Sequence, residues 1–178
     1  MQLGIMTKTE EVQKFLLYTT NQVFKVLNQI IEKAPDHKLG FKPAEKSMPF
    51  GHLAVHVYNM CYLYAVGPVT GGFDYRDFND LFLDPRYVKT KEEILLYAGA
   101  VKKKIIETTA LITEKIFEKE IKYDFSTAPE DHFTHGWGTW KLQSYASLMS
   151  ILEEAIHHRA QLNLYLRIME IEPVFVYN

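Results

Sequence analysis

The chain has 178 residues, of which 47% are hydrophobic and 24% are charged; this globular composition excludes a disordered tail protein. The net charge of −2 argues against nucleic acid as a partner, because domains that bind a phosphate backbone are usually basic. The single cysteine excludes an intramolecular disulfide and a cysteine-rich zinc site. We expect one domain spanning residues 1–178.

Neither a signal peptide nor a membrane span is predicted. The first eight residues lack a basic segment followed by an apolar one. No run of 18 or more uncharged apolar residues occurs in the sequence. We therefore expect a cytoplasmic protein with no membrane partner.

The first two predicted helices have apolar residues at helical spacing. The first covers residues 7–33, and Thr7 with Glu10 forms a capping box at its start. The second begins at Ser47, a favourable N-cap, and stops before Gly67-Pro68.

Two more helices follow, each after a long connection. The third runs from Thr90, which forms a capping box with Glu93, to about Glu118, and the fourth covers residues 139–169. The connections cover residues 69–87 and 123–138. Strand-like alternation is confined to short stretches, so the sequence predicts an all-α four-helix bundle with long connections between helices 2 and 3 and between helices 3 and 4.

The last predicted helix carries a polar stripe beside its apolar one. At about 100° per residue, these side chains fall on one narrow face: Gln143, Ser147, Ser150, Glu154, His158, Gln161 and Tyr165. Such a stripe is either the solvated edge of the helix or part of a functional site. Periodicity leaves both interpretations open.

Two pairs of metal-ligating side chains stand four residues apart on separate helices. His52 and His56 share a face of the second helix, and Glu154 and His158 share a face of the last one. Facing helices that project such pairs inward form metal sites in bundles. Imidazole and carboxylate ligands suit Zn²⁺, Ni²⁺, Mn²⁺ or Fe²⁺. The alternative is that each histidine is an ordinary core or surface residue.

Two motifs in these helices are characteristic of a known family. The first is Ser47-Met48-Pro49-Phe50-Gly51-His52-Leu53-Ala54-Val55-His56, and the second is His157-His158-Arg159-Ala160-Gln161, continued by Tyr165-Leu166-Arg167, Glu172-Pro173 and Tyr177. Together they resemble the DinB/YfiT-like family, which is unrelated in fold to the DNA polymerase of similar name. The resemblance covers nearly the whole chain.

The resemblance implies a four-helix bundle, frequently a homodimer, in which three histidines hold a divalent metal. By position the ligands are His56 and His158, whose rings we expect to face each other across the two helices. The third position is Glu154 in place of histidine. A carboxylate binds the same ions and leaves coordination positions open. His52 is a further candidate ligand.

The resemblance also suggests an activity on a small-molecule substrate. Relatives use the metal to bind a low-molecular-weight thiol, such as bacillithiol, and transfer or isomerise through it. A metal with an open position activates either a thiol or water, so the chain is predicted to be an S-transferase-like or hydrolase-like enzyme. The alternative is a metal- or ligand-binding dimeric module without turnover, which the departure at Glu154 favours.

Other chemically active side chains have less specific surroundings. Cys61 lies about 140° around the second helix from His56 and is expected to be a buried apolar residue. The aromatic and imidazole side chains before the last helix are candidates to line the mouth of the site: His132, His135, Trp137 and Trp140.

Overall fold

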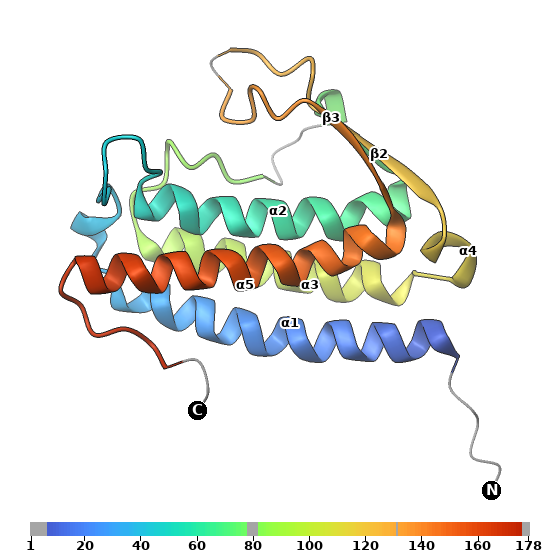
Figure 1. Cartoon of the computed structure of the whole chain (residues 1–178), viewed down its shortest axis with the longest axis horizontal. Coiled ribbons are helices and arrows are strands. Elements are labelled where there is room, and N and C mark those ends of the chain that lie inside the picture. The colour runs from blue at the N-terminus through green and yellow to red at the C-terminus, as the bar shows by residue number, and fades with distance from the viewer. Residues whose placement is uncertain (1–6, 78–81, 131, 176–178) are drawn as a thin grey trace, which may run out of the picture.

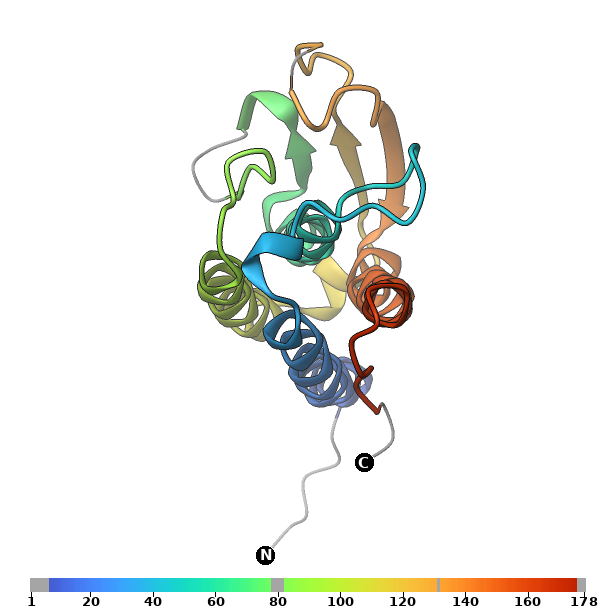
Figure 2. The ribbon, with the colours of Figure 1, turned by 90° about the vertical axis from the view of Figure 1, so that its left-hand side faces the viewer.

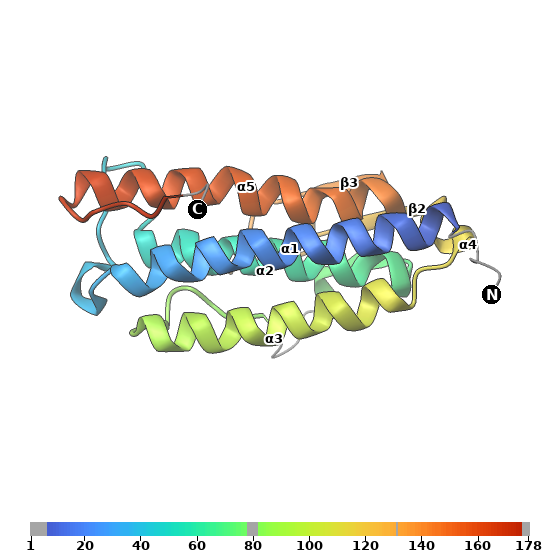
Figure 3. The same cartoon turned by 90° about the horizontal axis from the view of Figure 1, so that it is seen from below.

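The computed structural model describes residues 7–77, 82–130 and 132–175. Four long helices form a bundle: α1 (Lys8–Lys33), α2 (Phe50–Thr70), α3 (Lys91–Ala110) and α5 (Ser144–Ile168). Figures 1 and 3 show that α1 and α5 run in one direction and that α2 and α3 run in the opposite one. The predicted four-helix bundle is confirmed. Within these ranges, no helix has the length and apolarity needed to cross a membrane.

A small sheet, which was not predicted, covers one side of the bundle. Its strands are β1 (Gly72–Asp74), β2 (Glu120–Asp124) and β3 (Thr139–Gln143), in the order β1-β2-β3. β1 pairs with β2 in parallel and β2 with β3 in antiparallel, which sets Tyr123 opposite Trp140. The shorter elements are α4 (Glu114–Phe117) and two 3₁₀ turns, η1 (Asp36–Lys38) and η2 (Tyr75–Asp77).

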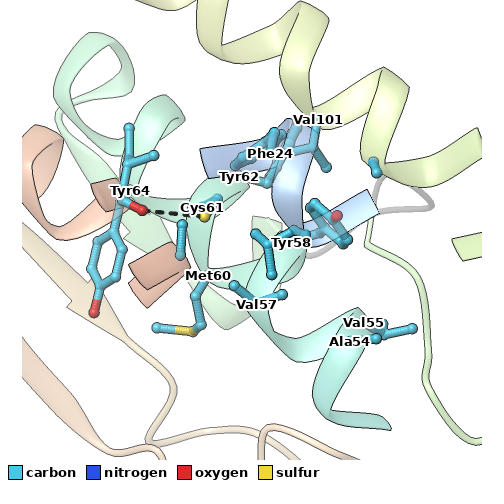
Figure 4. Close-up of a cluster of buried hydrophobic side chains, with 14 of the residues drawn as sticks. Phe24, Ala54, Val55, Val57, Tyr58, Met60, Cys61, Tyr62, Tyr64 and Val101 are labelled. Carbon is cyan, nitrogen blue, oxygen red and sulfur yellow. Dashed lines mark hydrogen bonds between the residues drawn. The ribbon is translucent and has the colours of Figure 1, made fainter. Parts of the chain in front are cut away.

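The helix α2 occupies the centre of the molecule, between the sheet and the other long helices (Figure 2). Most of its side chains are buried, as expected of a helix that is covered on all sides. In Figure 4, Phe24 and Val101 lie on one side of α2, and Met60 and Tyr64 lie on the other. Two layers of the protein therefore meet on this helix.

Cys61 lies within this buried cluster (Figure 4), as predicted. Its Sγ contacts the carbonyl oxygen of Ile151 at 3.5 Å. Burial raises the pKa of the Cys61 thiol well above its ordinary value, so the thiolate that nucleophilic chemistry requires is suppressed. Cys61 is a packing residue.

The start of α2 differs from the prediction. The helix begins at Phe50, with Pro49 as its N-cap, instead of at Ser47. The amides of Phe50 and Gly51 donate to the carbonyls of Phe41 and Leu39, at 3.0 and 2.8 Å. Backbone from the preceding loop thus satisfies the first amides of the helix, a role that sequence analysis gave to the Ser47 side chain.

The predicted limits of the last two long helices also need correction. The third helix ends at Ala110 instead of near Glu118, and the side chain of Gln13 donates to the carbonyls of Thr109 and Ile112 where the chain turns away. Residues 139–143 were assigned to the last helix but form β3. Pairing with β2 provides these five residues with backbone hydrogen bonds that a helix would otherwise supply.

Candidate metal centre

Three candidate ligands meet where α2 and α5 face each other. His56 comes from α2, and Glu154 and His158 come from successive turns of α5. One donor atom from each of the three side chains lies within 4.8 Å of the other two. The rings of His56 and His158 are perpendicular, with centroids 5.0 Å apart. The expectation that these histidines face each other is therefore confirmed.

Both ring nitrogens of His158 have partners. Its Nε2 lies 3.0 Å from Oε2 of Glu154, and its Nδ1 lies 2.7 Å from Oε1 of Gln161. The amide nitrogen of Gln161 in turn lies 3.0 Å from Nε2 of His157. Gln161 therefore fixes the orientation of the His158 ring and directs Nε2 toward the triad, as neighbours of metal-binding histidines commonly do.

The electrostatics of the site keep two of the candidate ligands, His56 and Glu154, in the protonation states that a metal needs. Burial lowers the pKa of His56 to about 4, with His158 adding to the effect and Glu154 opposing it. Burial pushes the pKa of Glu154 upward, but the hydrogen bond and charge of His158 outweigh it and the net shift is downward. Near neutral pH His56 is thus neutral and Glu154 is ionised, as metal coordination requires.

The donor set fits a divalent ion. Two imidazoles and one carboxylate form one of the ligand sets of catalytic zinc sites, in which three protein ligands leave a further position open. The three donor atoms lie within 4.8 Å of one another. Ligand bonds of about 2.0–2.2 Å to one shared ion require donor atoms closer together than that distance. His158 and Glu154 are already near that spacing, because 3.0 Å separates their donor atoms.

The structure gives His52 different surroundings. Within the described ranges, the group of mutually close donor atoms contains His56, Glu154 and His158 and leaves His52 outside. Burial lowers the pKa of His52, and Asp84 has the opposite effect. His52 therefore lies within electrostatic range of Asp84 and one helix turn before His56, outside the triad.

The polar stripe on the last helix contacts α2 and the loop before it, and it supplies two members of the triad. Ser147 is fully buried, and its hydroxyl donates to the carbonyl of Tyr64 at 2.9 Å. At the other end of α5, the Tyr165 hydroxyl donates to the carbonyl of Met48 at 2.9 Å. Between them lie Glu154, His158 and Gln161. The stripe thus joins two helices and is not merely the solvated edge of one.

A pocket of about 400 Å³ opens beside the triad. The described residues that line it are His56, Met60, Tyr64, Trp137, Trp140 and Glu154. Trp137 and Trp140 therefore lie where sequence analysis placed them. Met60 and Tyr64 were assigned only to the apolar stripe, although their spacing from His56, four and eight residues, puts them on its helix face.

The two histidines of the loop before β3 have other partners. His132 Nδ1 lies 2.8 Å from the Thr134 hydroxyl, and the His132 ring packs against Tyr75. His135 Nδ1 lies 3.1 Å from the carbonyl oxygen of Ala128. Neither belongs to the described lining of the pocket. Their polar contacts hold the loop that carries Trp137.

Solved structures provide the comparison for this fold. Neither a protein-family model nor a curated protein matches the sequence. The crystal structure of the DinB-like protein YjoA from Bacillus subtilis matches with a TM-score of 0.63 and 23% identity, over 90% of this chain and 96% of that one. A DinB-like protein from Bacillus cereus matches with a TM-score of 0.67 and 16% identity, over 91% and 95% of the two chains. The chain therefore has the fold of the DinB-like proteins, as the sequence motifs predicted.

Proposed function

We propose that this protein is a metal-dependent enzyme that hydrolyses a small-molecule substrate in the pocket beside the triad. The observation that carries the proposal is the convergence of His56, Glu154 and His158, of which His56 and Glu154 also line that pocket. A divalent ion bound by three protein ligands supplies Lewis acidity, which makes water or a thiol nucleophilic near neutral pH.

The residues of this chain have separate tasks in the proposal. His56 and His158 would present ring nitrogens to the ion, and Glu154 would present a carboxylate oxygen. Gln161 holds the ring of His158 in place through Nδ1. The walls formed by Met60, Tyr64 and the two tryptophans exclude water from one side of a bound substrate.

Transfer to a low-molecular-weight thiol, such as bacillithiol, is the second candidate. The observation that favours it is the size of the pocket: about 400 Å³ admits far more than one water molecule, whose share of liquid volume is about 30 Å³. A thiol co-substrate would use the same ligands and the same open position. A metal-binding module without turnover shares the triad but not the substrate chemistry.

Metal binding is tested by titrating the chelator-treated protein with Zn²⁺, Ni²⁺, Mn²⁺ and Fe²⁺ by calorimetry, the last under anaerobic conditions. We expect one site per chain, weakened at least about tenfold by Glu154→Gln and maintained by Glu154→His. Glu153→Gln is the matched control, because Glu153 is exposed on the neighbouring position of α5. Equal affinities for the parent and Glu154→Gln would remove the carboxylate from the ligand set.

Turnover is tested with a panel of aryl esters and amides, with and without a low-molecular-weight thiol. We expect product from water alone in the metal-loaded protein, loss of product after chelation, and a matching loss in Glu154→Gln. Product that forms only with the thiol would establish the second candidate instead. A stoichiometric metal with no product under either condition would support the module without turnover.

A further inference from the structure

The pocket beside the triad has walls made largely of aromatic rings. Trp137 and Trp140 are the two tryptophans of the sequence, and both line this pocket together with Tyr64. Both indoles are half-buried, so each retains surface that a ligand can cover. The ring of Trp137 also packs edge-on against His56, with centroids 5.8 Å apart. The aromatic wall therefore reaches directly to a candidate ligand of the metal.

Rings behind the wall hold Trp140 in place. Tyr123 and Phe125 stack on Trp140 with interplanar angles of 20° and 11°. Tyr123 is fully buried, and its hydroxyl lies 2.6 Å from the Ser147 hydroxyl. Phe125 is also buried, and its ring packs against the ring of Trp137 with centroids 5.0 Å apart. The small sheet thus supports a preformed aromatic surface over the triad. Because these rings are already held in place, a ligand that binds there loses little free energy to the ordering of side chains.

We propose that this pocket binds a planar aromatic group of the substrate, next to the bond that reacts at the triad. Flat rings stack on indole and phenol faces with a geometric preference that saturated rings lack. The identification of the bound molecule as a substrate rests on the proposed hydrolytic function. The preference for an aromatic ring rests only on the pocket and is testable without turnover.

The charges of the residues that line the pocket also favour a neutral aromatic ligand. Glu154 contributes a carboxylate, and no lysine or arginine is among the described residues that line the pocket. A thiol with several carboxylates would meet no cationic side chain on these walls. A ring that carries a single neutral ester or amide group requires none, because its polar group lies at the triad and its flat part lies against the tryptophans.

The two tryptophans allow a direct binding experiment on the full chain without metal. Each indole N–H gives one cross-peak in a proton–nitrogen correlation spectrum, so two cross-peaks report on the pocket. Benzamide and cyclohexanecarboxamide share a polar group and differ in the flatness of the ring. We expect benzamide to shift both peaks and to bind at least about fivefold more tightly than the saturated amide. Malate, a dianion without a ring, is expected to shift neither.

Variants then locate the binding surface. Trp137→Leu is expected to lower benzamide affinity at least about fivefold, and Trp137→Phe is expected to restore most of it because it keeps a flat ring. Phe175→Leu is the control, since Phe175 is an exposed aromatic residue in the C-terminal segment, outside the described lining of the pocket. Thermal transitions verify that each variant is folded, and the comparison of the two amides requires no variant.

The outcomes separate this inference from the proposed function. Equal affinity for the two amides, or tighter binding of malate, would overturn the aromatic preference even if the protein binds metal and hydrolyses esters. Selective binding of benzamide by a protein that binds no metal would support the aromatic site and overturn the proposed hydrolase. Benzamide selectivity together with metal binding supports both.

Discussion

The hydroxyl of Ser147 on α5 donates a hydrogen bond to the main-chain carbonyl of Tyr64 on α2, over 2.9 Å. In a regular helix that carbonyl would accept from the amide of residue 68, but residue 68 is proline and has no amide hydrogen. Ser147 therefore supplies the missing donor, and α2 continues through Gly67-Pro68 to Thr70. The Tyr123 hydroxyl donates to Ser147 in turn, since the proton of Ser147 is directed at Tyr64.

Ser147→Ala should destabilise the protein by about 1–3 kcal/mol, because it leaves the Tyr64 carbonyl and the Tyr123 hydroxyl buried without their partner. In a Pro68→Ala background the amide of residue 68 can bond to Tyr64, so the same substitution should cost clearly less. Urea denaturation followed by circular dichroism measures the four free energies of unfolding. Ser150→Ala is the control, since Ser150 bonds within its own helix. Equal costs in both backgrounds would contradict the proposed compensation.

Two glycines in helices should respond oppositely to the same substitution. A Cβ at Gly67 would collide with the phenol ring of Tyr123, whereas a Cβ at Gly99 would meet no atom within 4 Å. Gly67→Ala is therefore expected to lower the free energy of unfolding by about 1–3 kcal/mol through overpacking. Gly99→Ala is expected to raise it by about 0.5–1 kcal/mol through helix propensity. A neutral Gly67→Ala would mean that the Tyr123 side chain shifts without cost.

Local interactions decide those parts of the structure that the sequence predicts correctly. The predicted capping boxes at Thr7 and Thr90 both form, with their hydroxyls accepting from the amides of Glu10 and Glu93. Each joins residues three apart, so the sequence contains all the information that is needed. The pairing of Glu154 with His158 is equally local, because the helix alone brings them together.

Contacts between distant segments account for the rest. The start of α2 depends on carbonyls from Leu39 and Phe41, and its last turns depend on Ser147 from α5. The strands of the sheet have three or five residues, which is too short for alternation to distinguish them from loops. Because the sheet was not predicted, neither was the ring stack that positions Trp140.

Two carboxylates in the sheet, at the ends of β1 and β2, should make stability sensitive to acid. Bonds from Lys122, then from Ser126 and Thr139, hold the pKa of Asp124 far below its ordinary value. Side-chain and backbone bonds from Arg76 lower the pKa of Asp74 to about 2. In the unfolded chain these groups titrate near their ordinary value of about 3.9. Their stabilisation is therefore complete above that pH and is lost as the pH falls toward the folded pKa.

Urea midpoints measured between pH 6 and pH 2 check this expectation. The parent should lose stability below about pH 4, and Asp124→Asn should lose less over the same interval because one linked proton is removed. Glu130→Gln is the comparison, since Glu130 is an exposed carboxylate on the nearby loop. A decline of identical size in Asp124→Asn and the parent would show that Asp124 is not linked to acid unfolding.

Exposed apolar side chains on α1 and α5 support the expectation of a homodimer. Phe15 and Tyr18 on α1 are 54% and 67% exposed, and Ile156 on α5 is 44% exposed. The two helices lie side by side (Figure 3), and aromatic side chains are enriched in the cores of protein interfaces. Sedimentation at micromolar concentration should show a dimer.

The double substitution Tyr18→Lys with Ile156→Lys should shift the protein to monomer, because it places charges at two exposed apolar positions of the expected interface. Leu96→Lys on α3 is the control, since Leu96 is 71% exposed on a different helix. A monomeric parent would contradict the dimer. A dimer that persists in the double variant would show that the interface lies on another face of the protein.

Gln161 should determine how tightly the triad binds metal, although it is not itself a ligand. It accepts from Nδ1 of His158 over 2.7 Å, which leaves Nε2 directed at Glu154. Loss of such an orienting partner typically lowers metal affinity by about 10- to 100-fold.

Gln161→Leu should therefore weaken Zn²⁺ binding by that factor, measured by competition with a chromophoric chelator. Gln161→Glu should maintain binding, because its carboxylate accepts the same hydrogen bond. His157→Ala tests the other partner of Gln161 and should change affinity less than Gln161→Leu does, since His157 bonds the amide nitrogen of Gln161 and packs on the His158 ring at a centroid distance of 4.8 Å but does not bond to Nδ1 of His158. Tight binding in Gln161→Leu would mean that the walls of the site alone orient His158.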